Sequence, residues 1–464
     1  MALTRNLVRR GFYADSVALM RIAQALHKDG MAASLMIGTP SNKALLKESG
    51  LLTKEGESAR PDDLIIAVKG KNAAKALVLA EELLTSGPAN SSSLPADLAD
   101  ANLALISVPG EFAAAEARKV LERGLHVMIF SDNVPVREEV ALKDLAAGKG
   151  LLLMGPDCGT ALIAGTPIAF ANAVPRGDVG IVAASGTGLQ EVSSLLARLG
   201  RGVSHGIGVG GRDLSQEVGG RMALAALDAL EADPATRRII VISKPPAPSV
   251  TAKIVARAGR CRKPVTLCLL GSKKFRLPEN VRLARTLEEA AGMNGDSGEK
   301  TRIKPTGAIR GLFCGGTLCA EAQIVLLDLG LKVASNAPVP GAAHSGAPHR
   351  LIDLGADEYT RGRPHPMIEP ALRNEHLARA LREKSVGVVL LDLVIGYGAH
   401  PDPAGLLVEI LGRRKSRNIA VIASVTGTEA DPQVYSKQVK PLRAAGVIVA
   451  PSNAAAARLA ARRR

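Results

Sequence analysis

The stretch Gly180-Ile-Val-Ala-Ala-Ser-Gly-Thr-Gly-Leu-Gln-Glu191 reads as an apolar strand, a turn of small residues and the first turn of a helix. A second stretch, Gly311-Leu-Phe-Cys-Gly-Gly-Thr-Leu-Cys-Ala-Glu321, repeats this plan with its own Gly-Thr step. A helix that starts directly after a strand presents free backbone amides and the positive end of its dipole. Each stretch therefore predicts an anion site, and the pair predicts phosphoryl or acyl-phosphate chemistry.

Around these two stretches, short apolar strands alternate with helical segments, which predicts an α/β protein with parallel sheets. Aromatic residues make up only 2% of the chain, so the cores must consist of Ala, Val, Leu and Ile, as in parallel sheets. Polar stretches rich in Gly, Pro or Ser mark linkers at 86–95 and 293–305. The expected parts are a small N-terminal α/β domain (1–88), a Rossmann-like segment (101–175) and two flavodoxin-like domains with parallel sheets (176–292 and 306–464).

The composition argues against several classes of partner. The net charge of +15 is dispersed along the chain, which is typical of a basic solvated surface, and few aromatic side chains are available to stack on bases. The chain has no apolar run long enough to span a membrane and no signal-peptide pattern at its start. We therefore expect a cytoplasmic protein that binds neither nucleic acid nor membranes. The five cysteines follow no metal-binding spacing, so no metal is expected.

The candidate anion-binding residues lie where predicted strands end. Ser185 and Thr187 are either phosphate ligands or simple helix N-caps, and the glycines beside them are also compatible with a plain tight turn. Arg212 and Asp213 follow another strand, where they either contact a ligand or form a salt bridge. The predicted phosphate- and substrate-binding residues are Ser185, Gly186, Thr187, Gly188, Gly210, Gly211, Arg212, Asp213, Gly315, Gly316 and Thr317.

The candidate catalytic residues lie in loops that follow strands. The loop at 357–366 holds two arginines, and a histidine between two prolines, and arginine suits carboxylate or phosphate partners. Loops at 396–403 and 426–431 should share its sheet edge, so we expect one pocket, with a solvated surface loop as the alternative. The predicted catalytic residues are His205, His365, His400, Arg361 and Arg363, and His205 is also compatible with a core position.

Four long motifs give the chain a specific resemblance. They are Gly155-Pro-Asp-Cys-Gly-Thr-Ala161, Ala184-Ser-Gly-Thr-Gly-Leu-Gln-Glu191, Gly210-Gly-Arg-Asp-Leu-Ser215 and Thr360-Arg-Gly-Arg-Pro-His-Pro-Met367. On these motifs the chain resembles the FdrA family of the succinyl-CoA synthetase superfamily. The resemblance implies that 103–165 corresponds to half of a CoA-binding domain. It also implies an alpha-type ligase domain at 176–292, a beta-type ligase domain at 306–464, and that the two phosphate-binding helices of the synthetase share one chain.

The same resemblance implies an activity. Some family members are implied to be the large subunit of oxamate carbamoyltransferase, which converts oxalurate and phosphate into oxamate and carbamoyl phosphate in ureide (allantoin) catabolism. Others are named acyl-CoA synthetases, which carry phosphate on a histidine after the strand equivalent to Val265–Leu270. Here that region reads Gly271-Ser-Lys-Lys-Phe-Arg276, and the next histidine is His344.

This departure favours the carbamoyltransferase reading. On it, phosphate and carbamoyl phosphate are substrates, no cofactor is required, and the chain joins other subunits of the pathway in a hetero-oligomer. The alternative is an ADP-forming acyl-CoA synthetase, which would use CoA and a nucleotide. A third possibility, an anion-sensing or nucleic-acid-binding protein, rests only on the positive charge.

Overall fold

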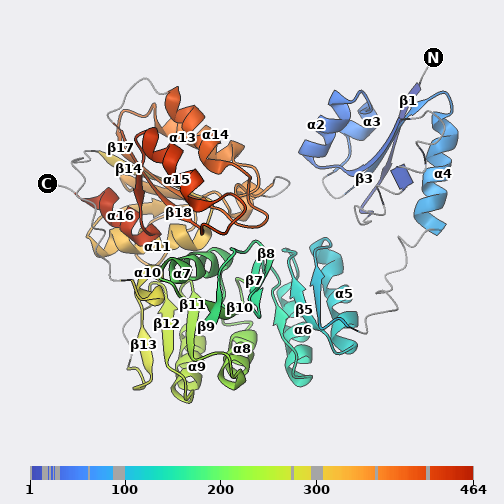
Figure 1. Cartoon of the computed structure of the whole chain (residues 1–464). Coiled ribbons are helices and arrows are strands. Elements are labelled where there is room, and N and C mark those ends of the chain that lie inside the picture. The colour runs from blue at the N-terminus through green and yellow to red at the C-terminus, as the bar shows by residue number, and fades with distance from the viewer. Residues whose placement is uncertain are drawn as a thin grey trace. The chain divides into compact units, whose positions relative to one another are not determined.

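The computed structural model describes residues 3–12, 19, 22–23, 26, 32–60, 63–86, 100–272, 276–293, 307–360, 364–413 and 419–462. The chain divides into two units, which are described separately (Figure 1). One consists mainly of Met1–Asn102, and the other holds most of the chain after residue 120. Arg361 and Arg363 lie outside the described residues.

The first unit contains the predicted small α/β domain. Its antiparallel sheet has the order β1 (Leu3–Arg9), β3 (Leu64–Gly70), β2 (Ala32–Ile37). Its described helices are α2 (Pro40–Glu48), α3 (Lys54–Glu57) and α4 (Ala73–Ser86). Residues 64–68 of β3 are all apolar because alternate side chains enter two different cores, Leu64, Ile66 and Val68 in one and Ile65 and Ala67 in the other.

A short parallel sheet follows, as expected for the Rossmann-like segment. It consists of β4 (Leu103–Ile106), β5 (His126–Ile129) and β6 (Leu153–Met154). The helices that connect these strands are α5 (Gly110–Glu122) and α6 (Val136–Gly148). The Gly155–Gly159 turn comes directly after β6.

The next domain is built on a seven-stranded sheet and is called here the seven-stranded half. Its parallel strands are β9 (Arg176–Ala183), β10 (Val203–Gly208), β11 (Arg238–Ser243), β12 (Val265–Leu269) and β13 (Val281–Leu283). They lie in the order β10-β9-β11-β12-β13, the flavodoxin-like order 2-1-3-4-5. Its helices are α7 (Gly186–Arg198), α8 (Arg221–Ala232), α9 (Pro248–Gly259) and α10 (Leu287–Ala291).

An antiparallel hairpin, which the sequence did not predict, extends this sheet beyond β10. It consists of β7 (Thr160–Ile163) and β8 (Thr166–Ala169). Ala164 and Gly165 form its two-residue turn with φ values of 51° and 82°, as a tight hairpin turn requires. Because Ala-Gly is a weak turn signal, the sequence placed these residues in the preceding segment, whereas the structure adds them to this sheet.

The last domain is built on a six-stranded parallel sheet and is called the six-stranded half. Its strands are β14 (Ala308–Phe313), β15 (Val333–Ser335), β16 (His349–Asp353), β17 (Val386–Val394), β18 (Ala420–Thr426) and β19 (Ile448–Ala450). The order is β15-β16-β14-β17-β18-β19, so apart from β15 the order 2-1-3-4-5 recurs. Its helices are α11 (Gly316–Asp328), α12 (Asp357–Thr360), α13 (Ala371–Ala380), α14 (Pro403–Gly412), α15 (Tyr435–Ala444) and α16 (Asn453–Ala461).

The two halves share a middle layer of helices. Helices α7, α10, α11 and α16 lie between the two sheets and belong to one continuous apolar core (Figure 1). Helices α13, α14 and α15 pack on the other side of the six-stranded sheet around a separate core. This layering confirms the predicted pair of flavodoxin-like domains and places α7 and α11, which carry the two Gly-Thr motifs, side by side.

Candidate functional site

The amino ends of α7 and α11 meet. The hydroxyl oxygens Ser185 Oγ and Thr317 Oγ1 are 2.5 Å apart, although the two residues are 132 positions apart in the chain. A Cβ on Gly315 would lie 3.0 Å from the Cβ of Thr187, so any other residue at position 315 would crowd this approach. The two anion sites predicted from the sequence are therefore neighbours in one site.

The helix starts combine internal capping with free donors. Ser185 Oγ accepts a hydrogen bond from the Gly188 amide at 2.9 Å, so Ser185 is an N-cap and the Gly188 amide is already used. The amides of Gly186, Thr187, Gly316 and Thr317 lie in the first turns, where no carbonyl of the same helix can accept from them. These four amides flank the hydroxyl pair, and no acceptor among the described residues takes a hydrogen bond from them, so they can donate to an anion.

Buried Asp392 of β17 shapes the approach to α11. Its two carboxylate oxygens accept hydrogen bonds from the Cys314 and Gly315 amides, each at 2.7 Å. Burial raises the pKa of Asp392 to about 6, and these two amide donors oppose the shift. Asp392 thus fixes the turn before α11 and leaves the amides of the first helical turn free.

A lysine that the sequence did not single out stands beside the helix starts. Lys244 follows β11, and its Nζ lies 2.9 Å from the position that a Cβ would take on Gly316. Asp353 Oδ2, at the end of β16, lies 2.6 Å from the same position. Burial raises the pKa of Asp353, while the positive charge of Lys244 opposes that rise. Gly316 therefore sits in a cradle formed by one cation and one acid, which any side chain would fill.

His365 lies against the same turn. Its Nδ1 accepts a hydrogen bond from the Met367 amide at 3.2 Å, which assigns the ring proton to Nε2. Burial lowers the pKa of His365 to about 4, so the ring is neutral at pH 7. A Cβ on Gly355 would lie 2.7 Å from His365 Nε2 and 2.6 Å from the Cys314 carbonyl oxygen. The structure thus places a neutral N–H donor beside the start of α11.

The other two predicted histidines have different surroundings. The backbone amide of His400 donates to the Met367 carbonyl at 2.8 Å, so the loop at 396–403 contacts the loop of His365. His205 lies within β10, where its Nδ1 accepts from the Ala164 amide at 3.2 Å and its Nε2 is 3.7 Å from Asp233 Oδ2. The structure does not bring His205 to the helix starts.

The glycine-rich loop after β10 packs onto the turn after β6. A Cβ on Gly210 would lie 2.4 Å from the Pro156 carbonyl oxygen, and its φ of 88° also favours glycine. A Cβ on Gly211 would lie 3.3 Å from Asp157 Oδ2. Close packing thus explains Gly210, and it brings two of the family motifs into contact.

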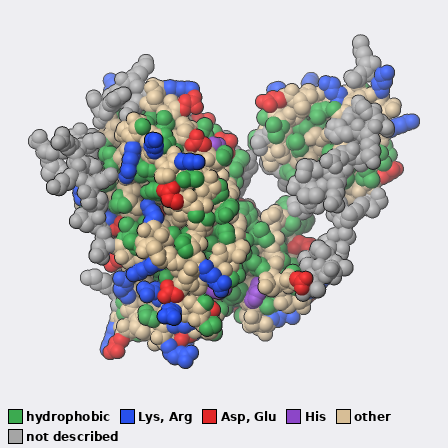
Figure 2. All heavy atoms as spheres, viewed as in Figure 1, with side chains coloured by type: hydrophobic (Ala, Val, Ile, Leu, Met, Phe, Trp, Pro, Cys, Tyr) green, Lys and Arg blue, Asp and Glu red, His purple; other side chains and the backbone are tan. Residues whose placement is uncertain are grey.

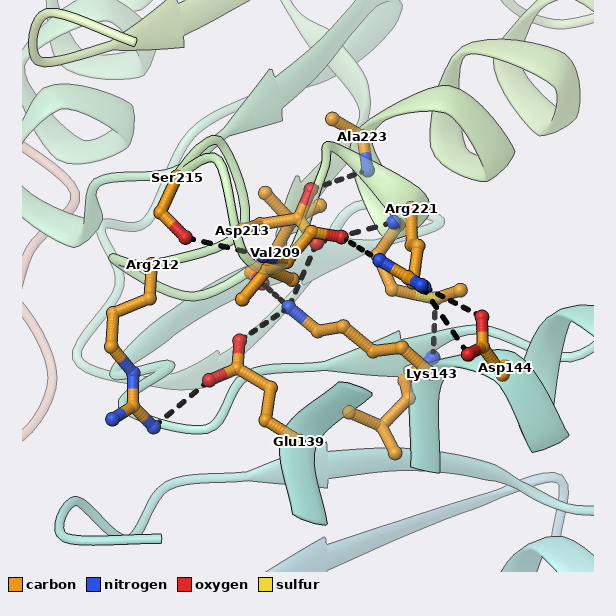
Figure 3. A network of polar contacts seen from close by, with 12 residues as sticks. Glu139, Lys143, Asp144, Val209, Arg212, Asp213, Ser215, Arg221 and Ala223 are labelled. Carbon is orange, nitrogen blue, oxygen red and sulfur yellow. Dashed lines mark hydrogen bonds and ion pairs between the residues drawn. The ribbon is translucent and has the colours of Figure 1, made fainter. Parts of the chain in front are cut away.

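Asp213 belongs to a buried network of charges (Figure 3). Lys143 of α6 is fully buried and donates to Glu139 Oε1 at 2.8 Å, Asp213 Oδ1 at 2.8 Å and the Val209 carbonyl at 3.0 Å. The Met222 and Ala223 amides also donate to Asp213 and so cap α8. Removing one partner of such a buried pair costs about 3–5 kcal/mol. Asp213 therefore has a structural role.

Arg212 precedes Asp213 in the same loop: one of its guanidinium nitrogens is held by a hydrogen bond and an ion pair, and the side chain is partly open to solvent. Its Nη2 donates to the Val134 carbonyl at 2.7 Å. The same atom lies 2.9 Å from Glu139 Oε2, as Figure 3 shows. The side chain is 40% exposed, and among the described residues Nε and Nη1 make no hydrogen bond. Arg212 can therefore offer the free edge of its guanidinium to an anion.

Two buried glutamates tie α7 and α11 together behind the helix starts. Glu191 and Glu321 hold the same place in the two motifs, six residues after Ser185 and Gly315. The Asn453 amide donates to Glu191 Oε1 at 3.2 Å, and Asn453 Nδ2 donates to Glu321 Oε2 at 2.7 Å. Burial raises the pKa of Glu321 to about 8, so at neutral pH this buried carboxyl keeps its proton in part.

A cavity of about 670 Å³ lies at the opposite, amino edge of the seven-stranded sheet, lined by Arg201, Arg237, Arg238 and Arg282. On the face drawn in Figure 2, Lys and Arg gather over the region that Figure 1 labels β11–β13 and α9. In doubly wound sheets ligands bind at the carboxyl edge, where the helix starts and Lys244 lie, which makes that edge the candidate site. No helix in the described ranges is long and apolar enough to cross a membrane.

Comparison with known proteins gives three family matches. Residues 312–463 match the CoA-ligase family, residues 176–261 match the CoA binding domain, and residues 1–97 match the domain described as "AllF, heavy metal-associated domain". These matches define a protein of the succinyl-CoA synthetase-like class. The CoA binding match falls on the seven-stranded half, which the sequence resemblance assigned to the ligase domain.

A full-length relative narrows this class. The chain is 41% identical over 493 residues to the uncharacterized protein YahF of Escherichia coli (strain K12), covering 96% of both chains. The chain therefore belongs to the YahF family, an FdrA-type branch of the succinyl-CoA synthetase-like proteins.

More distant relatives match only in part. The chain is 30% identical over 150 residues to succinate–CoA ligase [ADP-forming] subunit alpha-2 of Trichomonas vaginalis, covering 31% of this chain and 47% of that one. It is 29% identical to subunit alpha 2 of Archaeoglobus fulgidus, covering 32% and 51%. The chain thus spans about half the length of these ligase subunits. The solved dinucleotide-forming acetyl-coenzyme A synthetase 1 of Ca. Korarchaeum cryptofilum matches at 16% identity and a TM-score of 0.35, over 80% of this chain and 82% of that one, a score too low for any functional comparison.

The name of the N-terminal family implies a metal, and the residues do not fit one. The chain contains no cysteine before Cys158, so residues 1–97 lack the thiolates that soft metals prefer. In the described part of the chain no group of three or more His, Cys, Asp or Glu side chains is arranged to hold a metal ion.

Proposed function

We propose that the paired helix starts bind inorganic phosphate, or the phosphate of an acyl phosphate, and that the chain is a subunit of a phosphate-dependent carbamoyltransferase. The reaction would be oxalurate plus phosphate giving oxamate plus carbamoyl phosphate, in ureide catabolism. The observation that carries this proposal is the 2.5 Å contact between Ser185 and Thr317, with Lys244 beside Gly316. Four free amides and one ammonium group suit a phosphate dianion.

The chemistry needs only a well-placed phosphate beside a carbonyl group. A phosphate oxygen would attack the carbamoyl carbon, and the bond from that carbon to the oxamate nitrogen would break. The helix amides and Lys244 would hold the phosphate, while the neutral Nε2–H of His365 would donate to the carbonyl oxygen as negative charge develops. Positioning and electrostatic stabilisation, rather than a covalent enzyme intermediate, would then provide the acceleration.

A second candidate is an ADP-forming acyl-CoA synthetase. The CoA-ligase and CoA binding matches and the ligase alpha subunits among the relatives favour it. It requires a group that carries phosphate between nucleotide and acyl substrate. The chain has no histidine between His205 and His344, so the residue that would carry this phosphate after the strand at 265–269 is absent.

The experiment compares the two activities in the full chain combined with the other subunits that co-purify with it. We expect oxalurate and phosphate to yield carbamoyl phosphate. We also expect arsenate to replace phosphate and drive net breakdown of oxalurate, because acyl arsenates hydrolyse. Formation of ADP and an acyl-CoA from ATP, CoA and an acid, with an acid-labile phosphorylated residue and no oxalurate turnover, would establish the second candidate instead.

A further inference from the structure

We propose that Asp157 is the proton-transfer residue of this site and works beside two cations, Lys244 and Arg212. The inference rests on the proposed function and names a residue that the reaction requires. Asp157 is the central residue of the Gly155-Pro-Asp-Cys-Gly159 turn, which follows β6. It therefore comes from a different part of the chain than the two helix starts.

The position of Asp157 is fixed by its backbone while its carboxylate is left open. The Asp157 amide donates to the Ser131 carbonyl at 2.9 Å, and its φ of 56° is a left-handed value that non-glycine residues seldom adopt. Among the described residues its carboxylate accepts no hydrogen bond, and solvent reaches it although protein surrounds it on most sides. Backbone strain of this kind is concentrated at functional sites.

The charges around Asp157 come from four separate elements. Arg212 follows β10 and Lys244 follows β11, and both lower its pKa. Asp132 follows β5 and Asp357 begins α12, and both raise it. The crowding of protein around the carboxyl group is the largest cause that raises the pKa of Asp157, and the net effect with these charges is a pKa of about 6. A group with this pKa both accepts and releases a proton near neutral pH.

The reaction needs one such proton transfer. When a phosphate oxygen bonds to the carbamoyl carbon, the attacking phosphate loses one proton, and the departing amide nitrogen gains one as the carbon–nitrogen bond breaks. The Asp157 carboxylate would take the proton from phosphate and then give it to the nitrogen, returning to its starting state. Atoms and charges balance without an oxidant, a reductant or another reactant.

The same arrangement indicates the class of substrate. Lys244 stands at the phosphate cradle, and the charge of Arg212, whose guanidinium has a free edge, also acts on Asp157. We expect that edge to bind a carboxylate of the acyl donor. The site would then favour a small donor with its own carboxylate over a neutral amide of the same size.

The test compares Asp157→Asn with Asp132→Asn in the assembled complex that turns over oxalurate and phosphate. Asp132→Asn is the matched control because Asp132 is an exposed aspartate that acts on Asp157 only through its charge. Turnover in the wild type should rise as pH increases through about 6, where Asp157 becomes a base. Asp157→Asn should lower kcat at least ~100-fold and abolish this rise, while phosphate still raises the unfolding temperature.

Asp132→Asn should keep kcat within about threefold at pH 8 and move the rise to lower pH, because one charge that raises the pKa of Asp157 is gone. If Asp157→Asn keeps its activity and the rise near pH 6, the assignment of Asp157 is wrong and the proposed function stands. If the wild-type complex turns over no carbamoyl donor with phosphate, the proposed function fails and the assignment fails with it.

Discussion

The seven-stranded and six-stranded halves share one strand order and differ at equivalent positions. In the first, Gly208 ends the second strand and pairs with Ala183, and Ile242 of the third strand pairs with the same residue. In the second, Asp353 ends the second strand and pairs with Phe313, and the third strand carries Asp392 beside it. Two small or apolar residues of one half thus correspond to two buried acids of the other.

The charges near the helix starts divide in the same way. In the seven-stranded half two cations follow these strands. Arg212 follows β10, the strand of Gly208, and Lys244 follows β11, the strand of Ile242. The six-stranded half supplies carboxyl groups, of which Asp392 orients the turn before α11. One half thus places positive charge near the helix starts, and the other places there two carboxyl groups whose pKa burial raises.

The largest expected effect comes from filling the cradle where the halves meet. Gly316→Ala would place a Cβ 2.6 Å from Asp353 Oδ2 and 2.9 Å from Lys244 Nζ, so both groups must move. We expect phosphate-dependent turnover to fall ~100-fold, because displacements of about 1 Å at a reacting site have effects of that size. Gly186→Ala meets only Thr160 Oγ1, at 2.8 Å, and should cost less, and steady-state kinetics with both variants measure the difference.

Gly412→Ala is the control for these variants. It adds a methyl group near the end of α14 with no heavy atom within 4 Å and should leave turnover unchanged. Equal losses of turnover in Gly316→Ala and Gly186→Ala would show that the two halves do not differ at the cradle.

Lys244→Gln tests whether the seven-stranded half supplies the attracting charge. Loss of one charge-assisted contact of about 1.5–3 kcal/mol should weaken phosphate binding by ~10–100-fold, as measured by titration calorimetry. The pKa values of Asp353 and Asp157 should also rise, because Lys244 lowers both. The matched control is Lys253→Gln, which removes the charge of an exposed lysine in α9. If both substitutions weaken phosphate binding equally, Lys244 acts only as general surface charge.

Ser185→Ala and Thr317→Val separate capping from ligand binding. Ser185 caps α7, so its loss should destabilise the fold by about 1 kcal/mol. The only side-chain hydrogen bond of Thr317 within the described ranges is the hydroxyl contact, so its loss should cost less. Both variants should weaken phosphate binding severalfold. Thermal unfolding with and without phosphate measures both effects, and a greater loss of stability in Thr317→Val would contradict the assignment of the cap.

The smallest effect on phosphate binding is expected for Glu321, which lies behind the helix starts. The pKa of Glu321 is about 8 in the folded chain, above the usual value of 4.5, so the folded state keeps a proton that the unfolded chain releases. Stability from this group is therefore present below pH 4.5 and declines as the pH rises to 8. Glu321→Gln should flatten this decline by a few degrees in the unfolding temperature. Unfolding scans at pH 5 and pH 8 measure it, and an unchanged decline would assign the pH dependence to other groups.

Local sequence patterns predicted the two helix starts. The residues around them could not be predicted in this way, because the order of the strands in each sheet brings them there from distant parts of the chain. The Gly-Thr steps were visible because a strand, small residues and a helix follow within a dozen residues. Lys244, Asp353 and Asp392 escaped notice because each is a single residue at a strand end or inside an apolar strand, without a motif. Strand β16 was missed because it is short and follows an irregular stretch rich in Gly, Pro and His, and with it the cradle of Gly316 was missed.

The position of Asn453 in the chain has a consequence for synthesis. Asn453 opens α16, the last described helix, and its backbone and side chain join Glu191 to Glu321. Because domains fold in the order in which they leave the ribosome, the seven-stranded half can form long before this joint exists. This joint between α7 and α11 can therefore form only after α16 has been synthesised.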